Sequence, residues 1–227
     1  PLVSVIVPAL DEEALIGRAL DHLAALRPRP EVIVADGGSS DATRAVARTH
    51  PLRPVVIAAP RGRARQMNAG AAAARGELLL FLHADTRLPP GAGAALAAVA
   101  RRPRIVGGNF ALRFEGRGAF PRALGAWYAA QDRLGTHYGD SAMFARARAF
   151  RALGGFPDIP VMEDFELARA LRRLGPTRRL PGPAVTSGRR WRRLGVGRSL
   201  RAWVLIRTRY GMGVPPERLA RMYPPVR

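Results

Sequence analysis

Apolar and polar residues divide the first hundred positions into two kinds of segment. Short, almost wholly apolar runs predict strands buried on both faces, while apolar residues at helical spacing between them predict helices. The strands are expected at residues 2–7, 31–35, 54–58 and 77–82, and the helices at 12–25, 41–49 and 64–75. This alternation predicts an α/β domain with a mostly parallel sheet and helical crossovers.

Three residues are expected to mark the ends of these elements. Pro8 follows the first apolar run and is predicted to stop that strand. Asp41 is a good N-cap for the second helix, and Gly76 is expected to close the third helix as a C-cap.

The second half of the chain has a less regular pattern. Residues 106–114 resemble a strand with a kink at Gly107-Gly108, and residues 141–145 a short strand. Helices are expected at 127–134, 146–153 and 163–174, then as an amphipathic segment around 203–212 and a final helix at 217–222. No linker or repeat is evident, so the chain is expected to fold as a single domain with a helical C-terminal tail.

The amino-acid composition excludes several kinds of chemistry. The chain of 227 residues has no cysteine, which removes disulfides, thiolate metal sites and a cysteine nucleophile. All 37 basic residues are arginine, so a P-loop NTPase or a Schiff-base enzyme would lack its usual lysine.

The net charge of +20 is concentrated toward the C-terminus, where residues 169–227 contain sixteen arginines and one acidic residue, Glu217. This charge favours weak peripheral contact with phosphates or an anionic membrane over a specific nucleic-acid partner, because no nucleic-acid-binding motif accompanies it. A solvated basic surface is the alternative. The first residues form a strand pattern with no basic segment before it, and no apolar run is long enough to span a bilayer, so a cytoplasmic protein is expected.

Candidate functional residues follow the predicted strands, where ligands bind in open parallel sheets. A dinucleotide-binding domain would place G-x-G-x-x-G after its first strand. This chain instead has Pro8 there and no glycine before Gly17, which argues against an oxidoreductase.

Segments in the same order resemble family-2 glycosyltransferases with the GT-A (Rossmann-like) fold. The matching segments are 5–13 (VIVPALDEE), 34–43 (VADGGSSDAT), 65–70 (RQMNAG), 81–86 (FLHADT) and 162–164 (MED). Each motif alone is weak, but the five in series cover nearly the whole chain. "HADT" and a "GGF" turn are most similar to a bacterial subgroup from radical-SAM/selenium-domain and arsenosugar gene neighbourhoods.

The resemblance implies a nucleotide-sugar donor site at the first strand ends. Pro8, Ala9 and Leu10 would border the base and ribose, and Asp36 would accept an N–H of uracil or guanine; Asp36 is otherwise a turn residue. Glu12 or Glu13 would reach the ribose, unless they only favour a helix N-terminus. Arg65 would pair with Asp36 or reach the base and phosphates, and Asn68 and Gly70 would allow close packing of the helix.

The turn His83-Ala84-Asp85 stands where the family usually has Asp-x-Asp. Asp85 is the expected ligand of Mn²⁺ or Mg²⁺, because burying a carboxylate after an apolar strand is costly unless it is compensated. His83 replaces the first acid, and its role stays open between a ribose contact, a softer metal ligand and packing.

The acceptor side needs a base that removes a hydroxyl proton. By resemblance, Asp164 matches the family's base and Glu163 supports it, although acids at a helix start are common. Asp140 is a further candidate for the acceptor side or a turn residue. Arg190 and Trp191 resemble an element placed over the diphosphate and acceptor; the alternative is a basic surface with a buried Trp.

These assignments predict an inverting glycosyltransferase that uses a UDP- or GDP-linked sugar and an acceptor that the sequence does not identify. Residues 1–105 would form the nucleotide-sugar-binding half, 106–190 the acceptor half, and 191–227 a basic helical segment packed on them. The alternatives are a nucleotide-sugar-binding protein with weak or no turnover and a basic nucleic-acid-binding domain.

Overall fold

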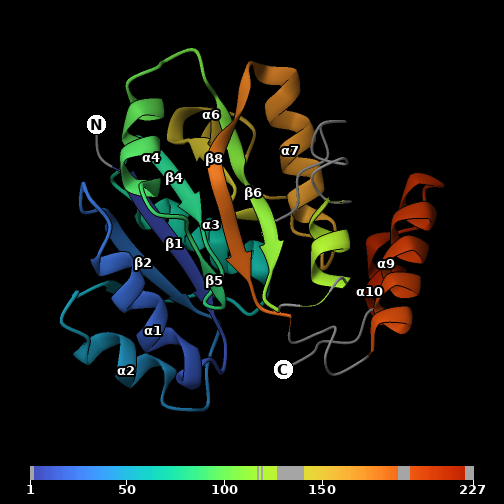
Figure 1. The fold of residues 1–227 in the computed structure, drawn as a ribbon, viewed down its shortest axis with the longest axis horizontal. Coiled ribbons are helices and arrows are strands. Elements are labelled where there is room, and N and C mark those ends of the chain that lie inside the picture. The colour runs from blue at the N-terminus through green and yellow to red at the C-terminus, as the bar shows by residue number, and fades with distance from the viewer. Residues whose placement is uncertain (1–2, 117, 119, 127–140, 189–194, 223–227) are drawn as a thin grey trace.

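A computed structural model describes residues 3–116, 118, 120–126, 141–188 and 195–222. The described residues form one central sheet with helices on both faces, and two further helices stand beside it (Figure 1). The predicted α/β class is therefore confirmed, and so is the helical C-terminal segment.

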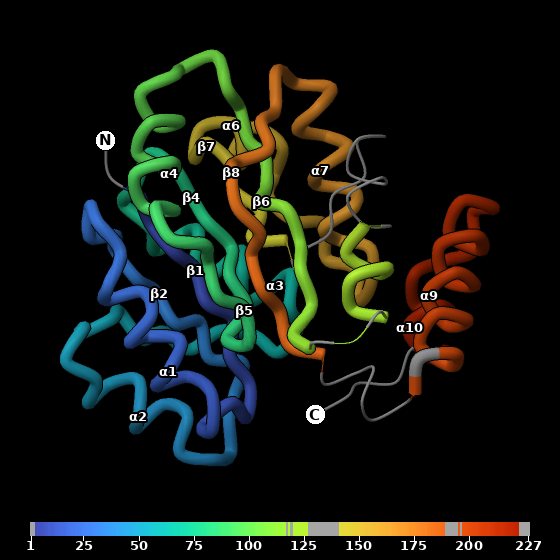
Figure 2. Tube along the Cα trace, in the orientation of Figure 1, coloured from blue at the N-terminus to red at the C-terminus, as the bar shows by residue number. Residues whose placement is uncertain are grey.

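The sheet contains eight strands in the order β3-β2-β1-β4-β7-β6-β8-β5. Strands β1 to β4 are parallel, β7 is antiparallel to both of its neighbours, β6 and β8 are parallel, and β5 is antiparallel to β8. In the trace, β6 and β8 run side by side although more than sixty residues separate them (Figure 2). Their bounds are β1 Val3–Ala9, β2 Glu31–Asp36, β3 Val55–Ala58, β4 Leu78–Phe81, β5 Thr86–Arg87, β6 Gly107–Phe114, β7 Phe144–Arg146 and β8 Thr177–Thr186.

The helices cover the sheet from two sides. Helices α1, α2 and α4 lie on the face toward the viewer in Figure 1, while α3, α6 and α7 lie behind the sheet. Alternate residues of β1 serve both sides: Val5 and Val7 pack in the core under α1 and α4, and Ile6 packs in the core with α3, α6 and α7. The helices are α1 Glu13–Ala24, α2 Thr43–Thr49, α3 Arg63–Ala73, α4 Ala92–Ala100, α6 Ala147–Ala152, α7 Glu163–Leu174, α9 Val196–Gly211 and α10 Pro216–Arg221.

The three predicted element ends are wrong in detail. β1 continues through Pro8, which pairs with Ala35 of β2. Beyond Ile6, β1 has a paired neighbour on only one side, so the N–H that proline lacks is not needed for pairing with a second strand. Helix α2 has Ala42 at its N-cap, while the Asp41 carboxylate accepts hydrogen bonds from the Thr43 and Glu13 N–H groups. Helix α3 ends at Ala73, where the chain becomes extended, and Gly76 donates its N–H to the Ser4 hydroxyl at 2.8 Å.

Strands β5 and β8 and helix α4 are absent from the sequence prediction. β8 contains Pro181, Gly182 and Pro183, which is typical of a turn, yet β6 supplies a parallel partner. The pairing moves from Phe110↔Leu180 to Ala111↔Pro183, so a bulge absorbs the extra residues. Gly182 lies in this bulge with a φ of +78°, a conformation that favours glycine. The predicted helix at 127–134 lies outside the described residues.

The C-terminal helices pack on the rest of the domain through aromatic and apolar side chains. The rings of Phe165 in α7 and Tyr210 in α9 meet edge to face at 6.1 Å, and the Arg207 guanidinium lies 4.9 Å from the Phe165 ring centre. Ile206 and Leu219 are buried together between these helices. Within the described ranges, no helix has both the length and the hydrophobicity needed to cross a bilayer.

Candidate active site

The carboxyl ends of β1, β2 and β4 lie at one edge of the sheet because these strands are parallel neighbours. The loops after β1 and β2 are joined by hydrogen bonds. The Asp11 N–H donates to the Ser39 hydroxyl at 3.0 Å, and the Ser40 N–H donates to the Asp11 carboxylate at 2.8 Å. Asp11 itself has a φ of +53°, so the loop after β1 turns sharply where Pro8, Ala9 and Leu10 end. Pro8 and Leu10 are half-buried and Ala9 is buried.

Asp36 occupies the end of β2 with only 1% of its side chain exposed. Its carboxylate accepts hydrogen bonds from the N–H groups of Gly38 and Ser39 and from the Ser39 hydroxyl. The cation beside it is Arg44, whose Nε lies 3.6 Å from the carboxylate. Asp36 therefore organises the turn after β2.

The predicted pairing of Arg65 with Asp36 is wrong. Arg65 lies in the first turn of α3 and donates from Nε to both carboxylate oxygens of Asp158, at 2.8 and 3.0 Å. Its side chain is exposed because it projects away from the sheet, whereas the next residue, Gln66, projects inward and is buried. The hydrogen bond from Arg65 lowers the pKa of the Asp158 carboxyl.

Gln66 ties two strand ends together, a role that its place in the sequence did not indicate. Its Nε2 donates to the carbonyl oxygens of Ala9 at 2.7 Å and Ala35 at 2.9 Å. A Cβ on Gly37 would lie 2.8 Å from the end of the Gln66 side chain, so a larger residue there would displace the Gln66 amide from these hydrogen bonds. A buried amide within an otherwise small-residue helix was the signal that could have indicated this role.

Asn68 and Gly70 support the packing of α3, as expected. The Asn68 side chain donates to the Phe156 carbonyl at 2.8 Å and accepts from the Phe156 N–H at 2.9 Å. A Cβ on Gly70 would lie 2.4 Å from the Ile6 side chain, so only glycine lets α3 approach β1 this closely.

The turn after β4 presents His83 and Asp85 beside a buried Ala84. The Thr86 N–H donates to the His83 carbonyl at 3.0 Å and closes the turn, and β5 begins at Thr86. Asp85 is half-buried and not fully buried as expected, because it lies in the turn after β4 and not in the strand itself. In the part of the chain that the structure describes, no three His, Cys, Asp or Glu side chains form a ready-made metal site.

The start of α7 carries three acidic residues, Glu163, Asp164 and Glu166, in its first turn. The chain enters this helix through Met162, whose φ of +69° is left-handed. Glu163 is buried, with 1% of its side chain exposed, and its carboxylate lies 2.7 Å from the Arg63 Nε. Asp164 is half-buried and accepts a hydrogen bond from the Phe165 N–H at 2.7 Å. The adjacent acids thus differ: Glu163 joins α7 to α3, and Asp164 is accessible.

One turn of α3 therefore connects the two groups of candidate residues. Arg63 contacts Glu163 at the start of α7, and Gln66, three residues later, contacts the ends of β1 and β2. Arg63 was also missed, because in a chain with 37 basic residues nothing in the sequence distinguishes it. Asp140, Arg190 and Trp191 lie outside the described residues.

Comparison with known proteins places this geometry in a family. The model of "Glycosyl transferase family 2" matches residues 4–154, well over half of the chain. A glucosyl-3-phosphoglycerate synthase from Mycolicibacterium paratuberculosis is 36% identical over 94 residues, which cover 37% of this chain and 28% of that protein. The chain thus spans less than a third of this curated relative.

Solved structures share the fold. A mannosyltransferase from Pyrobaculum calidifontis, in complex with GDP-Man and Mn²⁺, has a TM-score of 0.68 at 27% identity, covering 91% of this chain and 62% of its own. Glucosyl-3-phosphoglycerate synthase from Mycobacterium tuberculosis, with Mn²⁺, UDP and glucosyl-3-phosphoglycerate, has a TM-score of 0.61 at 21% identity, covering 90% and 78%. The fold, the order of the strand-end motifs and the family match agree: the chain belongs to glycosyl transferase family 2.

Proposed function

We propose that this chain transfers a sugar from a UDP- or GDP-linked donor to an acceptor hydroxyl, with Asp164 as the base. The observation that carries the proposal is the first turn of α3. Through Gln66 and Arg63 it joins the strand ends proposed to hold the nucleotide to the helix that bears Asp164. One framework would thereby carry both the donor and the base, which supports the proposal because a transfer reaction requires the two to be held in a fixed geometry.

The nucleotide is proposed to lie over the loops after β1 and β2. Half-buried Pro8 and Leu10 would border the base, with Ala9 between them and Glu12 near the ribose. Asp36 would contact the base through its turn, and Asn68 contributes indirectly by holding the turn at Phe156 against α3. Arg65 would need to leave Asp158 to reach the nucleotide, so we give it no direct contact.

The cation that relatives bind would be held by Asp85, with His83 beside it. A site with so few protein ligands suits Mg²⁺ or Mn²⁺, because Mg²⁺ commonly binds one or two carboxylates and completes its shell with substrate phosphates. When bound, such a cation neutralises the charge of the leaving diphosphate. The chain contributes a half-buried carboxylate in the turn after β4.

Asp164 is proposed to take the proton of the acceptor hydroxyl. The hydroxyl oxygen then attacks the anomeric carbon in one inverting displacement, as the bond from that carbon to the nucleoside diphosphate breaks and the diphosphate leaves. The accessible carboxylate of Asp164 lies at a helix N-terminus, and Glu163 anchors that terminus to Arg63. Asp140, Arg190 and Trp191 stay candidates for the acceptor and diphosphate side. The "HADT" and "GGF" segments, 83–86 and 154–156, support the bacterial radical-SAM/arsenosugar-neighbourhood subgroup as a finer proposal.

The proposed division keeps residues 1–105 as the donor half, 106–190 as the acceptor half and 191–227 as the basic segment. Helix α9 of that segment exposes Val204 and the arginines Arg198, Arg201 and Arg209, it contains no acidic residue, and the exposed Met212 follows it. This combination supports weak peripheral contact with an anionic membrane. A cytoplasmic location is part of the same proposal.

A thermal-shift panel of UDP, GDP, CDP and dTDP with Mn²⁺, followed by donor hydrolysis and transfer assays, tests the function. At 100 times Kd, a nucleotide should add about 2.7 kcal/mol to the free energy of unfolding. Asp85→Ala should remove the metal dependence of nucleotide binding and turnover. The control Glu217→Gln, which removes an exposed carboxylate on α10, should leave that dependence unchanged. If none of the nucleotides stabilises the protein, the donor site is wrong; if they bind without turnover, the chain is a nucleotide-sugar-binding protein.

A further inference from the structure

A cavity of about 740 Å³ lies beside the last three strands of the sheet, apart from the residues assigned to the donor or the base. It is formed by β5, β6, β8 and the helical segment 120–126. Its lining includes Arg87, Arg113, Glu115, Arg122, Pro183 and Val185. Arginines on a protein this basic are common, so the arrangement inside the cavity must decide whether it is a site.

The strand register places two of these arginines on either side of one residue. Val185 of β8 pairs with Arg87 of β5 and with Arg113 of β6. Paired residues on neighbouring strands point to the same face, so both guanidinium groups rise from one face of the sheet with Val185 between them. Two strand spacings separate their Cα atoms by roughly 10 Å, which leaves room for an anion between the two long side chains.

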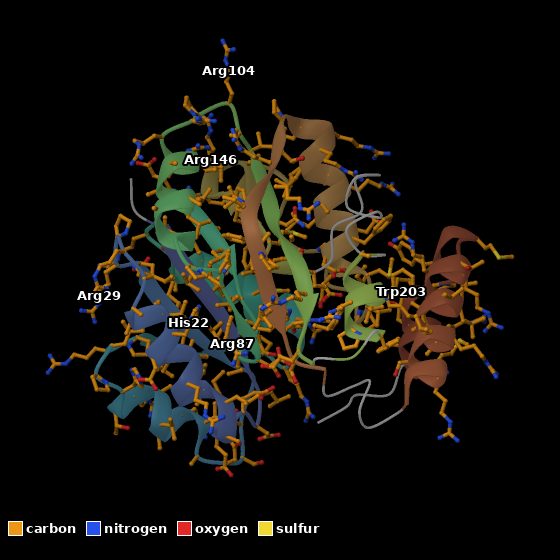
Figure 3. All side chains as sticks on the ribbon, viewed as in Figure 1. His22, Arg29, Arg87, Arg104, Arg146 and Trp203 are labelled. Atoms are coloured by element: carbon orange, nitrogen blue, oxygen red, sulfur yellow. The ribbon has the colours of Figure 1, made fainter. Side chains whose placement is uncertain are left out.

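The charges of this cavity are unbalanced. Glu115 pairs with Arg87 at 2.7 Å. Among the described residues, Arg113 and Arg122 have no carboxylate partner, so three arginines face one glutamate and the lining carries a net charge of +2. Burial, and then the charge of Arg87, lower the pKa of His22, whose Nε2 accepts a hydrogen bond from the N–H of Leu88, the residue after Arg87 (Figure 3).

We propose that this cavity binds the phosphate group of a small organic phosphate monoester. A phosphate monoester carries about −1.5 to −2 charges at neutral pH, which matches the excess charge of the lining. A planar guanidinium group can bind two phosphate oxygens at once, whereas the ammonium group of a lysine acts as a point charge. The volume is in the range of small-molecule sites, about 300–1,000 Å³, and exceeds what one phosphate ion needs.

The apolar part of the lining suits the organic portion of such a ligand. Pro183 and Val185 form the β8 part of the cavity, and Pro121 and Gly125 contribute the side of the helical segment. The proposal stands independently of the donor assignment, because none of the residues proposed for the nucleotide, the cation or the base lines the cavity.

The test compares two double variants of equal charge by isothermal titration calorimetry with glycerol 3-phosphate and with inorganic phosphate. Arg113→Gln/Arg122→Gln removes the two unpartnered cations of the cavity. The control, Arg101→Gln/Arg104→Gln, removes two exposed arginines after α4. Arg104 projects from the top of the molecule in Figure 3, away from Arg87. Circular dichroism melting confirms that both variants fold.

Binding of glycerol 3-phosphate is expected to be saturable, and the cavity variant should raise its Kd at least about tenfold, the loss of one charge-assisted contact. The control variant should keep the parent Kd within about twofold, and the parent should bind glycerol 3-phosphate more tightly than inorganic phosphate. Equal losses in both variants would overturn the site, since they would reflect net charge alone. Equal affinity for the two ligands would overturn the assignment to a monoester. Titrations repeated with UDP and Mn²⁺ present report on the donor site separately.

Discussion

The ion pair between Arg63 and Glu163 is expected to stabilise the contact between α3 and α7, and its size can be worked from the structure. The Glu163 side chain is 1% exposed and the Arg63 side chain 39% exposed, with 2.7 Å between Nε and Oε1. Removing one partner of a buried pair costs about 3–5 kcal/mol, because the other charge stays buried without compensation. Water reaches the arginine end of this pair, so Arg63→Gln should cost about 2 kcal/mol, less than that range.

Glu163→Gln should cost less, about 1 kcal/mol, since it leaves a neutral amide in place of a buried charge. The double variant should then lose less than the sum of the two, with a coupling energy of about 1 kcal/mol. Each variant is measured by urea unfolding and by thermal melting. For a chain of this size, 2 kcal/mol corresponds to a fall in Tm of roughly 4–8 °C.

A second ion pair on the same helix turn provides a matched control. Arg65 and Asp158 have similar bonding distances, but their side chains are 53% and 60% exposed. Water screens such a pair, so Arg65→Gln should leave the free energy of unfolding unchanged within error. If Arg63→Gln and Arg65→Gln cost the same, or the Arg63 and Glu163 losses are additive, burial does not distinguish the two pairs and the reasoning fails.

Three further predictions concern single residues. Asp164→Asn should lower turnover by about 10²- to 10⁴-fold while donor affinity stays within a few-fold. A fully active variant would show that another carboxylate is the base, and Asp140 would be tested first. Arg146 is buried and donates hydrogen bonds to the carbonyls of Ile105, Val99, Ala100 and Arg102. Arg146→Met should therefore lower the free energy of unfolding, measured by urea titration, by roughly 3 kcal/mol. Arg148→Met loses only one exposed hydrogen bond, to the Pro103 carbonyl, and should cost much less in the same titration. Burial, and then the hydrogen bond to Glu166, raise the pKa of Tyr210 to about 12. The stabilising contribution of the protonated Tyr210 should therefore be complete below pH 10 and be lost as the pH rises through 12. The difference in the free energy of unfolding between the parent and Tyr210→Phe should shrink from pH 8 to pH 11, and a constant difference would contradict this.

The sequence by itself determined the elements whose residues carry a strong local pattern. The buried runs of β1, β2 and β4 and the amphipathic period of α7 are visible without a partner, because a strand between two helical layers or a helix on a sheet must be apolar wherever it is covered. The strand-end motifs followed from the same reasoning, since parallel strands place their carboxyl ends together. This was enough to indicate the class of fold and the edge where chemistry is expected.

Only the tertiary structure decided which side chains meet. The strand β8 exists because β6 pairs with it across a bulge, although its own Pro-Gly-Pro segment is typical of a turn. Nearby arginines along the chain are chemically alike, yet Arg63 meets a buried glutamate and Arg65 an exposed aspartate, while Asp36 is matched by Arg44 and by neither of them. Those partners are more than ninety residues away for both α3 arginines. Pairing at such a separation depends on how the helices pack on the sheet, which no local pattern of residues encodes.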